Sequence, residues 1–179
     1  MRQEVIISGF GGQGVIKAGV LLATAAMHEG KHCTHFPSYG AEMRGGTANC
    51  SVIVSSDEIA SPVITNPDTA IVLNEPSMDK FEPRLKKGGL LIYNSSLIPR
   101  KPKRDDITAI AVPANDIAEK LGTVKCANMT VLGAYIAQTG AVTLDSIKST
   151  LTAVFYKLKQ DLINTNKTAL DEGAQLAKK

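Results

Sequence analysis

Cysteine and aromatic residues are scarce in this sequence, and both shortages exclude kinds of site. The three cysteines among 179 residues, Cys33, Cys50 and Cys126, lie far apart and form no Cys-x-x-Cys pair. Iron–sulfur clusters normally take four cysteine ligands, so no cluster is expected on this chain. Tryptophan is absent and aromatic residues make up 4% of the chain, which argues against a stacking surface for single-stranded nucleic acid.

Long apolar runs and a strong net charge are also missing. No apolar run reaches 18 residues, the length typical of a membrane-spanning helix. The beginning of the chain, MRQEVIISGFGGQG, does not have the pattern of a signal peptide. The net charge is 20 − 17 = +3, too small to indicate nucleic-acid binding. With its sparse, odd set of cysteines, the chain is expected to be cytoplasmic.

Strands and helices alternate along most of the chain. Residues 3–8 predict a short buried strand, 13–28 a helix and 32–36 a second strand. This strand–helix–strand unit favours parallel pairing of its two strands. Further strands are expected at 47–56, 70–74, 90–94 and 107–114, and further helices near 77–88, 115–122, 128–140 and 143–155.

This alternation predicts a single α/β domain over residues 1–179, with a mostly parallel open sheet and helices on both faces. The C-terminal region is expected to be helical, with 157–179 as a loosely docked terminal helix because it is polar. The strand at 47–56 follows an irregular loop instead of a helix. It is therefore expected either to pair antiparallel or to leave the simple strand order.

A glycine-rich turn follows the first strand directly. Residues 9–14, GFGGQG, match G-x-G-x-x-G before a helix, and Gly11, Gly12, Gln13 and Gly14 are candidates for contact with an anion or cofactor. NAD binding also needs an acidic residue at the end of the second strand. That region reads CTHFPS, so NAD is not expected. The alternative is a turn that serves only tight strand–helix packing.

A second loop, PSYGAEMRGG at 37–46, lies where open α/β sheets bind ligands. Arg44 is suited to hold a carboxylate or phosphate, and Glu42 to orient it. Gly45 permits close approach of a ligand or another chain, and Tyr39 is a further candidate contact. The alternative is a loop satisfied internally by an Arg44–Glu42 pair.

Three further features have a purely structural explanation as well as a functional one. His32 points away from Cys33 and His35 on a strand, so these residues are not expected to bind a metal. The basic loop 99–104 is either a solvated turn or a contact for an acidic partner. Asn128 is a natural N-cap for the helix at 128–140, whose first amides could also meet an anion.

Three motifs together, GFGGQG at 9–14, PSYGAEMRGG at 37–46 and NMTVLGA at 128–134, resemble the gamma subunit of the 2-oxoacid:ferredoxin oxidoreductases. The likeness covers about residues 1–155. The second loop is most similar to the members that act on 2-oxoglutarate and branched-chain 2-oxoacids.

The resemblance implies a multisubunit enzyme that is inactive when this chain is alone. The complex would oxidise a 2-oxoacid with coenzyme A and pass electrons to ferredoxin. Thiamine diphosphate, magnesium and the iron–sulfur clusters would belong to alpha, beta and delta subunits. This chain would help to form the coenzyme A channel through its two loops, and would self-associate when isolated.

A second hypothesis is a free-standing nucleotide- or coenzyme A-binding module with a regulatory role. Co-purification with oxidoreductase subunits would separate the two hypotheses. Under either one, no metal or catalytic residue is expected on this chain.

Overall fold

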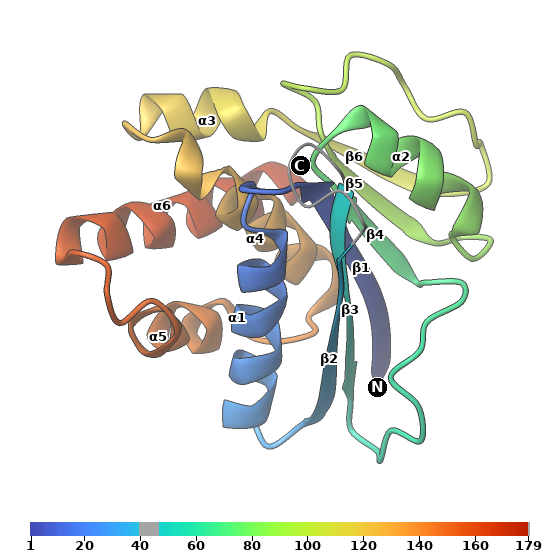
Figure 1. Ribbon diagram of the computed structural model, residues 1–179, viewed down its shortest axis with the longest axis horizontal. Helices are drawn as coiled ribbons and strands as arrows, with labels where there is room; N and C mark the ends of the chain where they lie inside the picture. The colour runs from blue at the N-terminus through green and yellow to red at the C-terminus, as the bar shows by residue number, and fades with distance from the viewer. Residues whose placement is uncertain (40–46, 179) are drawn as a thin grey trace.

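The computed structural model describes residues 1–39 and 47–178, which form one α/β domain around a six-stranded sheet (Figure 1). The strand order is β2-β3-β1-β4-β5-β6. The strands are β1 (Arg2–Phe10), β2 (His32–Tyr39), β3 (Thr47–Ser55), β4 (Thr69–Val72), β5 (Leu90–Asn94) and β6 (Thr108–Val112). Strands β1, β4, β5 and β6 pair in parallel, so the expected mostly parallel sheet is confirmed.

Strand β3 lies between β1 and β2 and is antiparallel to both. The expectation that the first two strands pair with each other is therefore wrong, whereas the antiparallel alternative for 47–56 is confirmed. Burial explains the order, because Val52, Ile53 and Val54 are fully buried. The more apolar strand occupies the interior position, and β2, with its exposed Phe36, takes the edge.

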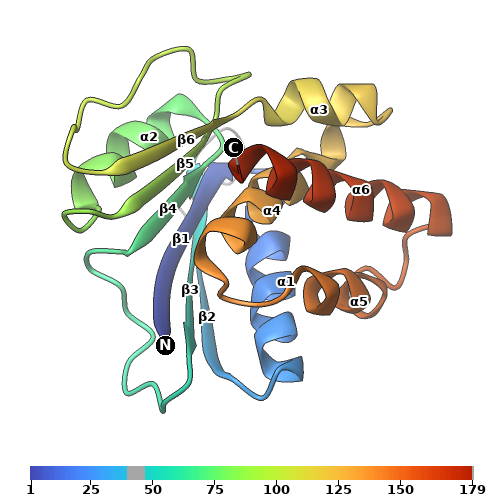
Figure 2. The same cartoon turned by 180° about the vertical axis from the view of Figure 1, so that it is seen from behind.

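Helices cover both faces of the sheet, as expected, but unequally. One face carries α1 (Val15–His28), α4 (Ala127–Thr139), α5 (Leu144–Val154) and α6 (Gln160–Ala177), and the short α3 (Ala114–Lys120) lies at its end (Figures 1 and 2). The other face carries α2 (Glu75–Phe81) and a 3-10 turn at Glu82–Arg84. Across residues 1–39 and 47–178, no helix is long and apolar enough to cross a membrane.

Helix α6 packs closely against α4, although a loosely docked segment was expected at 157–179 (Figure 2). Two glycines make the contact. A Cβ atom added at Gly133 would overlap the Leu170 carbonyl oxygen, and one at Gly173 would overlap the Thr130 carbonyl oxygen. The polar composition of α6 reflects its outer face, while Leu170 and Ala174 on its inner face are buried.

The basic loop at 99–104 is held by internal contacts. Glu82 is 2% exposed and accepts hydrogen bonds from the Arg100 guanidinium at 3.0 Å and from the backbone amides of Lys103 and Arg104. Arg100 also pairs with Asp79 at 2.6 Å. These contacts tie the loop to α2 and the following 3-10 turn, while Lys101 and Lys103 remain exposed, as in a solvated turn.

Candidate functional site

The glycine turn lies at the carboxyl end of β1 and leads directly into α1. The backbone amide of Gln13 donates a hydrogen bond to the Phe10 carbonyl at 3.1 Å and closes the turn. Gly12 and Gly14 have φ values of 98° and 74°, a region that favours glycine. Gly14 is the N-cap of α1 and provides no side-chain cap, so among the described residues the first amides of the helix have no side-chain partner.

Gln13 holds the turn in place from within. Its Oε1 accepts a hydrogen bond from the Phe10 amide at 2.6 Å, and its Nε2 donates to the Leu73 carbonyl at 3.3 Å. The side chain therefore joins the turn to the residue that follows β4. Both ends of the Gln13 side-chain amide are used inside the protein, whereas Phe10, Gly11 and Gly12 are the exposed part of the turn.

Asn128 approaches the same turn from α4. Its Nδ2 donates to the Gly14 carbonyl at 3.1 Å, and the residue is only 6% exposed. Its buried Oδ1 accepts no hydrogen bond from the residues that the structure describes. The expected capping role is wrong, because α4 begins at Ala127 with Cys126 as its N-cap. Asn128 instead lies inside the first turn, where its side chain reaches the glycine motif.

Two cavities adjoin the glycine turn. The larger, about 520 Å³, lies among the turn, α1, β3, the start of α4 and the linker between α5 and α6. The smaller, about 150 Å³, lies at the ends of β4 and β5 beside Leu73, Asn94 and Asn115. Gly12 and Lys125 line both cavities. This position is the carboxyl edge of the parallel strands, where α/β sheets bind ligands.

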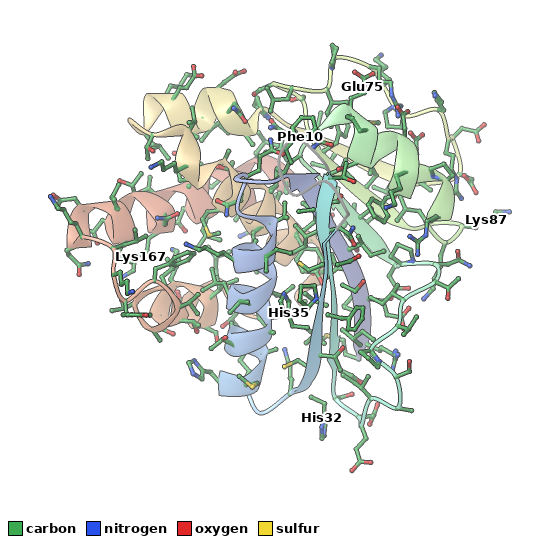
Figure 3. All side chains as sticks on the ribbon, viewed as in Figure 1. Phe10, His32, His35, Glu75, Lys87 and Lys167 are labelled. Atoms are coloured by element: carbon green, nitrogen blue, oxygen red, sulfur yellow. The ribbon has the colours of Figure 1, made fainter. Side chains whose placement is uncertain are left out.

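The larger cavity combines apolar walls with positive charge. Phe10, Phe155, Leu158 and Leu162 contribute apolar surface, and Figure 3 shows Phe10 at the end of β1. The two charged residues among the described lining are Lys17 and Lys125, and no carboxylate accompanies them. The cavity is therefore suited to a ligand that has both an apolar part and an anionic part.

The candidates Glu42, Arg44 and Gly45 lie outside the described residues, as does the side chain of Tyr39. The flanking strands are informative. Strand β2 ends at Tyr39 opposite Ala48, and β3 begins at Thr47 opposite Phe10. Thr47 and Ala48 also line the larger cavity. Strand β2 therefore ends, and strand β3 begins, beside the glycine turn.

The histidines and cysteines do not form a metal site within the described residues. His32 is exposed at one end of β2, whereas His35 faces α1 (Figure 3), as the strand period predicts. Burial raises the pKa of the Cys50 thiol to about 12 and also raises the pKa values of Cys33 and Cys126. The thiols stay protonated, which makes them poor nucleophiles and ligands.

Sequence reasoning missed Lys17, Lys125 and Phe155. Lys17 could have been found, because it is three residues from Gly14 in the first turn of the helix that the motif opens. Lys125 and Phe155 carry no comparable signal. They reach the glycine turn only because α4, α5 and α6 fold onto the same face of the sheet.

Comparison with known proteins identifies the family to which this chain belongs. Residues 4–176 match the family described as pyruvate ferredoxin/flavodoxin oxidoreductase. The match spans nearly the whole chain, including the glycine turn and all six helices, and the chain belongs to this family.

Individual relatives show which members of the family this chain is similar to. The chain is 38% identical over 98% of its length to the ketoisovalerate oxidoreductase subunit VorA of Methanothermobacter marburgensis, and it spans 37% of that protein. It is 33% identical over 99% of its length to the 2-oxoglutarate synthase subunit KorC of Methanocaldococcus jannaschii, covering 95% of it. The gamma subunit of a keto/oxoacid ferredoxin oxidoreductase from Geobacter sulfurreducens has the same fold, with a TM-score of 0.86 and 32% identity over 99% of this chain and 97% of that one.

Proposed function

We propose that this chain is the gamma subunit of a 2-oxoacid:ferredoxin oxidoreductase complex. In this proposal the complex converts a 2-oxoacid, coenzyme A and oxidised ferredoxin into an acyl-CoA, CO₂ and reduced ferredoxin. The observation that carries the proposal is the match to separate subunits of the same length, KorC and the Geobacter gamma subunit, over 95% and 97% of their chains.

The substrate is proposed to be 2-oxoglutarate or a branched-chain 2-oxoacid in preference to pyruvate. The relatives named for ketoisovalerate and 2-oxoglutarate enzymes are 33–38% identical to the chain. The common gamma subunit of the pyruvate and ketoisovalerate oxidoreductases of Thermococcus kodakarensis is 31% identical over a shorter stretch, 85% of the chain. The difference is small, so the test below compares the three substrates directly.

Thiamine diphosphate, magnesium and the iron–sulfur clusters are assigned to alpha, beta and delta subunits in this proposal. The three cysteines of this chain are separated, and Cys50 and Cys126 are buried, which supports that division. Coenzyme A is proposed to contact the glycine turn at Gly11, Gly12 and Gly14, with Gln13 and Asn128 positioning the turn. The Asn128 Oδ1, which has no hydrogen-bond partner within residues 1–39 and 47–178, and the cavity beside it fit such a contact.

The test is purification of the tagged chain from its natural host, followed by an assay of the intact assembly. We expect faster coenzyme A-dependent reduction of ferredoxin with 2-oxoglutarate or 2-oxoisovalerate than with pyruvate, together with alpha, beta and delta subunits in the cytoplasmic fraction. The isolated chain is expected to be colourless and inactive. A chain that purifies alone, with no oxoacid-dependent activity in the preparation, would contradict the proposal.

The second motif is proposed to act with the glycine turn, through Tyr39, Glu42, Arg44 and Gly45. Arg44→Ala in the assembled enzyme is expected to raise the KM for coenzyme A by about ten- to a hundredfold. The reason is the loss of a charge-assisted hydrogen bond worth roughly 1.5–3 kcal/mol. The melting temperature of the isolated subunit is expected to stay unchanged. A lowered melting temperature with unaltered kinetics would instead indicate a structural Arg44–Glu42 pair.

A further inference from the structure

Strand β2 forms one edge of the sheet and contributes little to the core. Every residue in the range 32–38 is exposed or half-buried, whereas Val52, Ile53 and Val54 of the neighbouring β3 are fully buried. Pro37 also has no amide hydrogen to donate to the ladder between the two strands. An edge strand with so few buried contacts can open while the rest of the sheet stays folded.

Two buried polar atoms of β2 lack hydrogen bonds, one on each face of the strand. Thr34 Oγ1 and His35 Nε2 have no partner within residues 1–39 and 47–178, and successive side chains of a strand point to opposite faces. Each atom gives up its hydration when the strand is docked and gains no hydrogen bond from these residues in return. Opening of β2 returns both atoms to water, which favours the open strand.

His35 is packed closely against α1 (Figure 3). A Cβ atom added at Gly19 would lie 2.9 Å from His35 Nε2 and 2.5 Å from Cys50 Sγ. The glycine therefore allows the imidazole ring to lie against the backbone of the helix. The Cys50 thiol beside it already donates to the Val15 carbonyl at 3.4 Å. The ring thus occupies a closely packed position between β2, β3 and α1.

The described groups that face His35 are uncharged. From α1 these are Gly19 and the Ile16 backbone, and from β3 the Cys50 thiol, whose pKa burial raises to about 12. On β2 itself, Cys33 lies on the same face, and burial raises its pKa as well. Burial lowers the pKa of His35, and no charged group of the described chain opposes that shift. A protonated ring in this position therefore has no carboxylate to pair with.

We propose that β2 is a pH-sensitive edge strand: protonation of His35 in mild acid releases it from α1 and β3 while the other strands of the sheet stay paired. The neutral ring fits beside Gly19, whereas the imidazolium is accommodated when the strand opens and the ring reaches water. Ala48 lies opposite Tyr39, the last residue of β2, and lines the larger cavity. Opening therefore also loosens one wall of the candidate site, a consequence that rests on the proposed function, whereas the opening itself does not.

Hydrogen exchange of the full chain, followed by mass spectrometry at pH 5.5, 6.5 and 7.5, tests the inference. The measured quantity is the protection factor, from which the ordinary pH dependence of amide exchange cancels. Peptides over 32–38 report on β2, and peptides over 90–94 report on β5 in the interior of the sheet. His35→Leu and His35→Gln remove the titration. His32→Gln is the matched control, because His32 is exposed on the same strand, and circular dichroism verifies that each variant is folded.

We expect the protection of 32–38 in the wild type to fall by up to about tenfold from pH 7.5 to pH 5.5. The reason is that the open strand takes up a proton on His35 near pH 6.5, whereas the docked strand does so only at lower pH. The docked form is thus favoured above that pH and loses this advantage as the pH falls. His32→Gln should show the same fall, both His35 variants should show almost none, and protection of 90–94 should change little.

Three outcomes overturn the inference. The protection of 32–38 does not depend on pH, the folded His35 variants keep the wild-type dependence, or 90–94 loses protection in step with 32–38, which would be unfolding of the whole sheet. If one His35 variant does not fold, the other decides. Because the experiment uses the chain without ligands or other subunits, its failure leaves the proposed oxidoreductase role standing, and failure of that role leaves the opening of β2 standing.

Discussion

Asn128 and Gly14 meet through one hydrogen bond that joins positions 114 residues apart. The geometry leaves no room for a side chain at Gly14, because a Cβ atom there would lie 2.5 Å from Asn128 Nδ2. Gly12 differs in this respect. It also has a positive φ, but no atom of the described residues lies within 4 Å of a Cβ placed there. Substitution of Gly12 therefore tests the cost of backbone strain alone, whereas substitution of Gly14 also tests the contact with α4.

Gly14→Ala is expected to destabilise the protein more than Gly12→Ala. Both substitutions force alanine into the left-handed region, at a cost of roughly 1–2 kcal/mol. Gly14→Ala also displaces Asn128 and breaks its hydrogen bond, which adds about 1 kcal/mol. Urea denaturation of the two variants measures the difference. Equal free energies of unfolding would show that the Asn128 contact does not stabilise the turn.

His35 is a titratable residue packed between β2 and α1. Its ring lies against Gly19, and its buried Nε2 has no partner among the described residues. Burial lowers the pKa of His35 below its ordinary value, and a hydrogen bond with the Ile16 backbone opposes this only in part. The neutral ring is therefore the form that the folded protein accommodates.

We expect His35 to make the protein less stable in mild acid. The unfolded chain takes up a proton on this residue near pH 6.5, the ordinary pKa of histidine, while the folded chain does so only at lower pH. Its contribution to stability is thus complete above that pH and is lost as pH falls toward the folded pKa. Melting temperatures from pH 8 to 5 should fall less steeply in His35→Leu than in the wild type. His32→Gln, at an exposed position on the same strand, is the control and should keep the wild-type slope.

At the scale of elements, the contact between α4 and α6 determines how the C-terminal region is held. Backbone approaches backbone where Gly133 and Gly173 face the opposite helix. Such a crossing brings the two axes close and buries the inner face of a helix that is polar on its outside. Helix α6 contributes Leu162 and Asn166 to the larger cavity, so its docking also shapes the candidate site.

Gly173→Ala is expected to lower the free energy of unfolding by roughly 3 kcal/mol. The added methyl group overlaps the Thr130 carbonyl oxygen, and α6 can accommodate it only by moving away from α4. Glu172→Ala, on the exposed side of the same helix, should change stability by less than about 0.5 kcal/mol. Urea unfolding monitored by circular dichroism distinguishes the variants. A neutral Gly173→Ala would show that the two helices do not need this close approach.

At the scale of the whole molecule, exposed apolar side chains gather around the two cavities. Phe10, Val124, Leu158 and Leu162 are 38–51% exposed and line one or the other. An apolar patch of this kind at a candidate ligand site is typical of a surface that meets another chain. In the proposed complex, partner subunits cover it.

The isolated chain is therefore expected to self-associate through this surface. Sedimentation should show an average mass that rises with protein concentration. Replacing Leu158 and Leu162 together by serine should reduce the association, because both side chains lie beside the larger cavity. Val63→Ser is the control, since Val63 is 66% exposed but lines neither cavity. A monomer at every concentration would contradict this prediction.

The strand–helix alternation and the glycine turn were predictable from sequence because both depend on local patterns. Short apolar runs such as residues 3–8 and 90–94 predict buried strands wherever they lie in a fold, and β1 and β5 appear there. Gly12 and Gly14 adopt the positive φ values that only glycine accepts readily. Helix boundaries agreed to within a few residues for α1, α4 and α5, whose ends are marked by local glycine or capping signals.

Tertiary structure alone decided which distant segments meet. Local patterns contain no signal that β3 enters between β1 and β2, because that order depends on which strand buries more apolar surface in the finished sheet. The role of Asn128 also depends on tertiary structure. Its local preference predicts an N-cap, but its side chain donates a hydrogen bond to the distant Gly14 carbonyl instead. Lys125 and Phe155 joined the candidate site only when α4, α5 and α6 packed on one face. The sequence by itself determined the elements and the glycine turn, and long-range packing decided the walls of the cavity, since those walls bring together residues that are neighbours only in space.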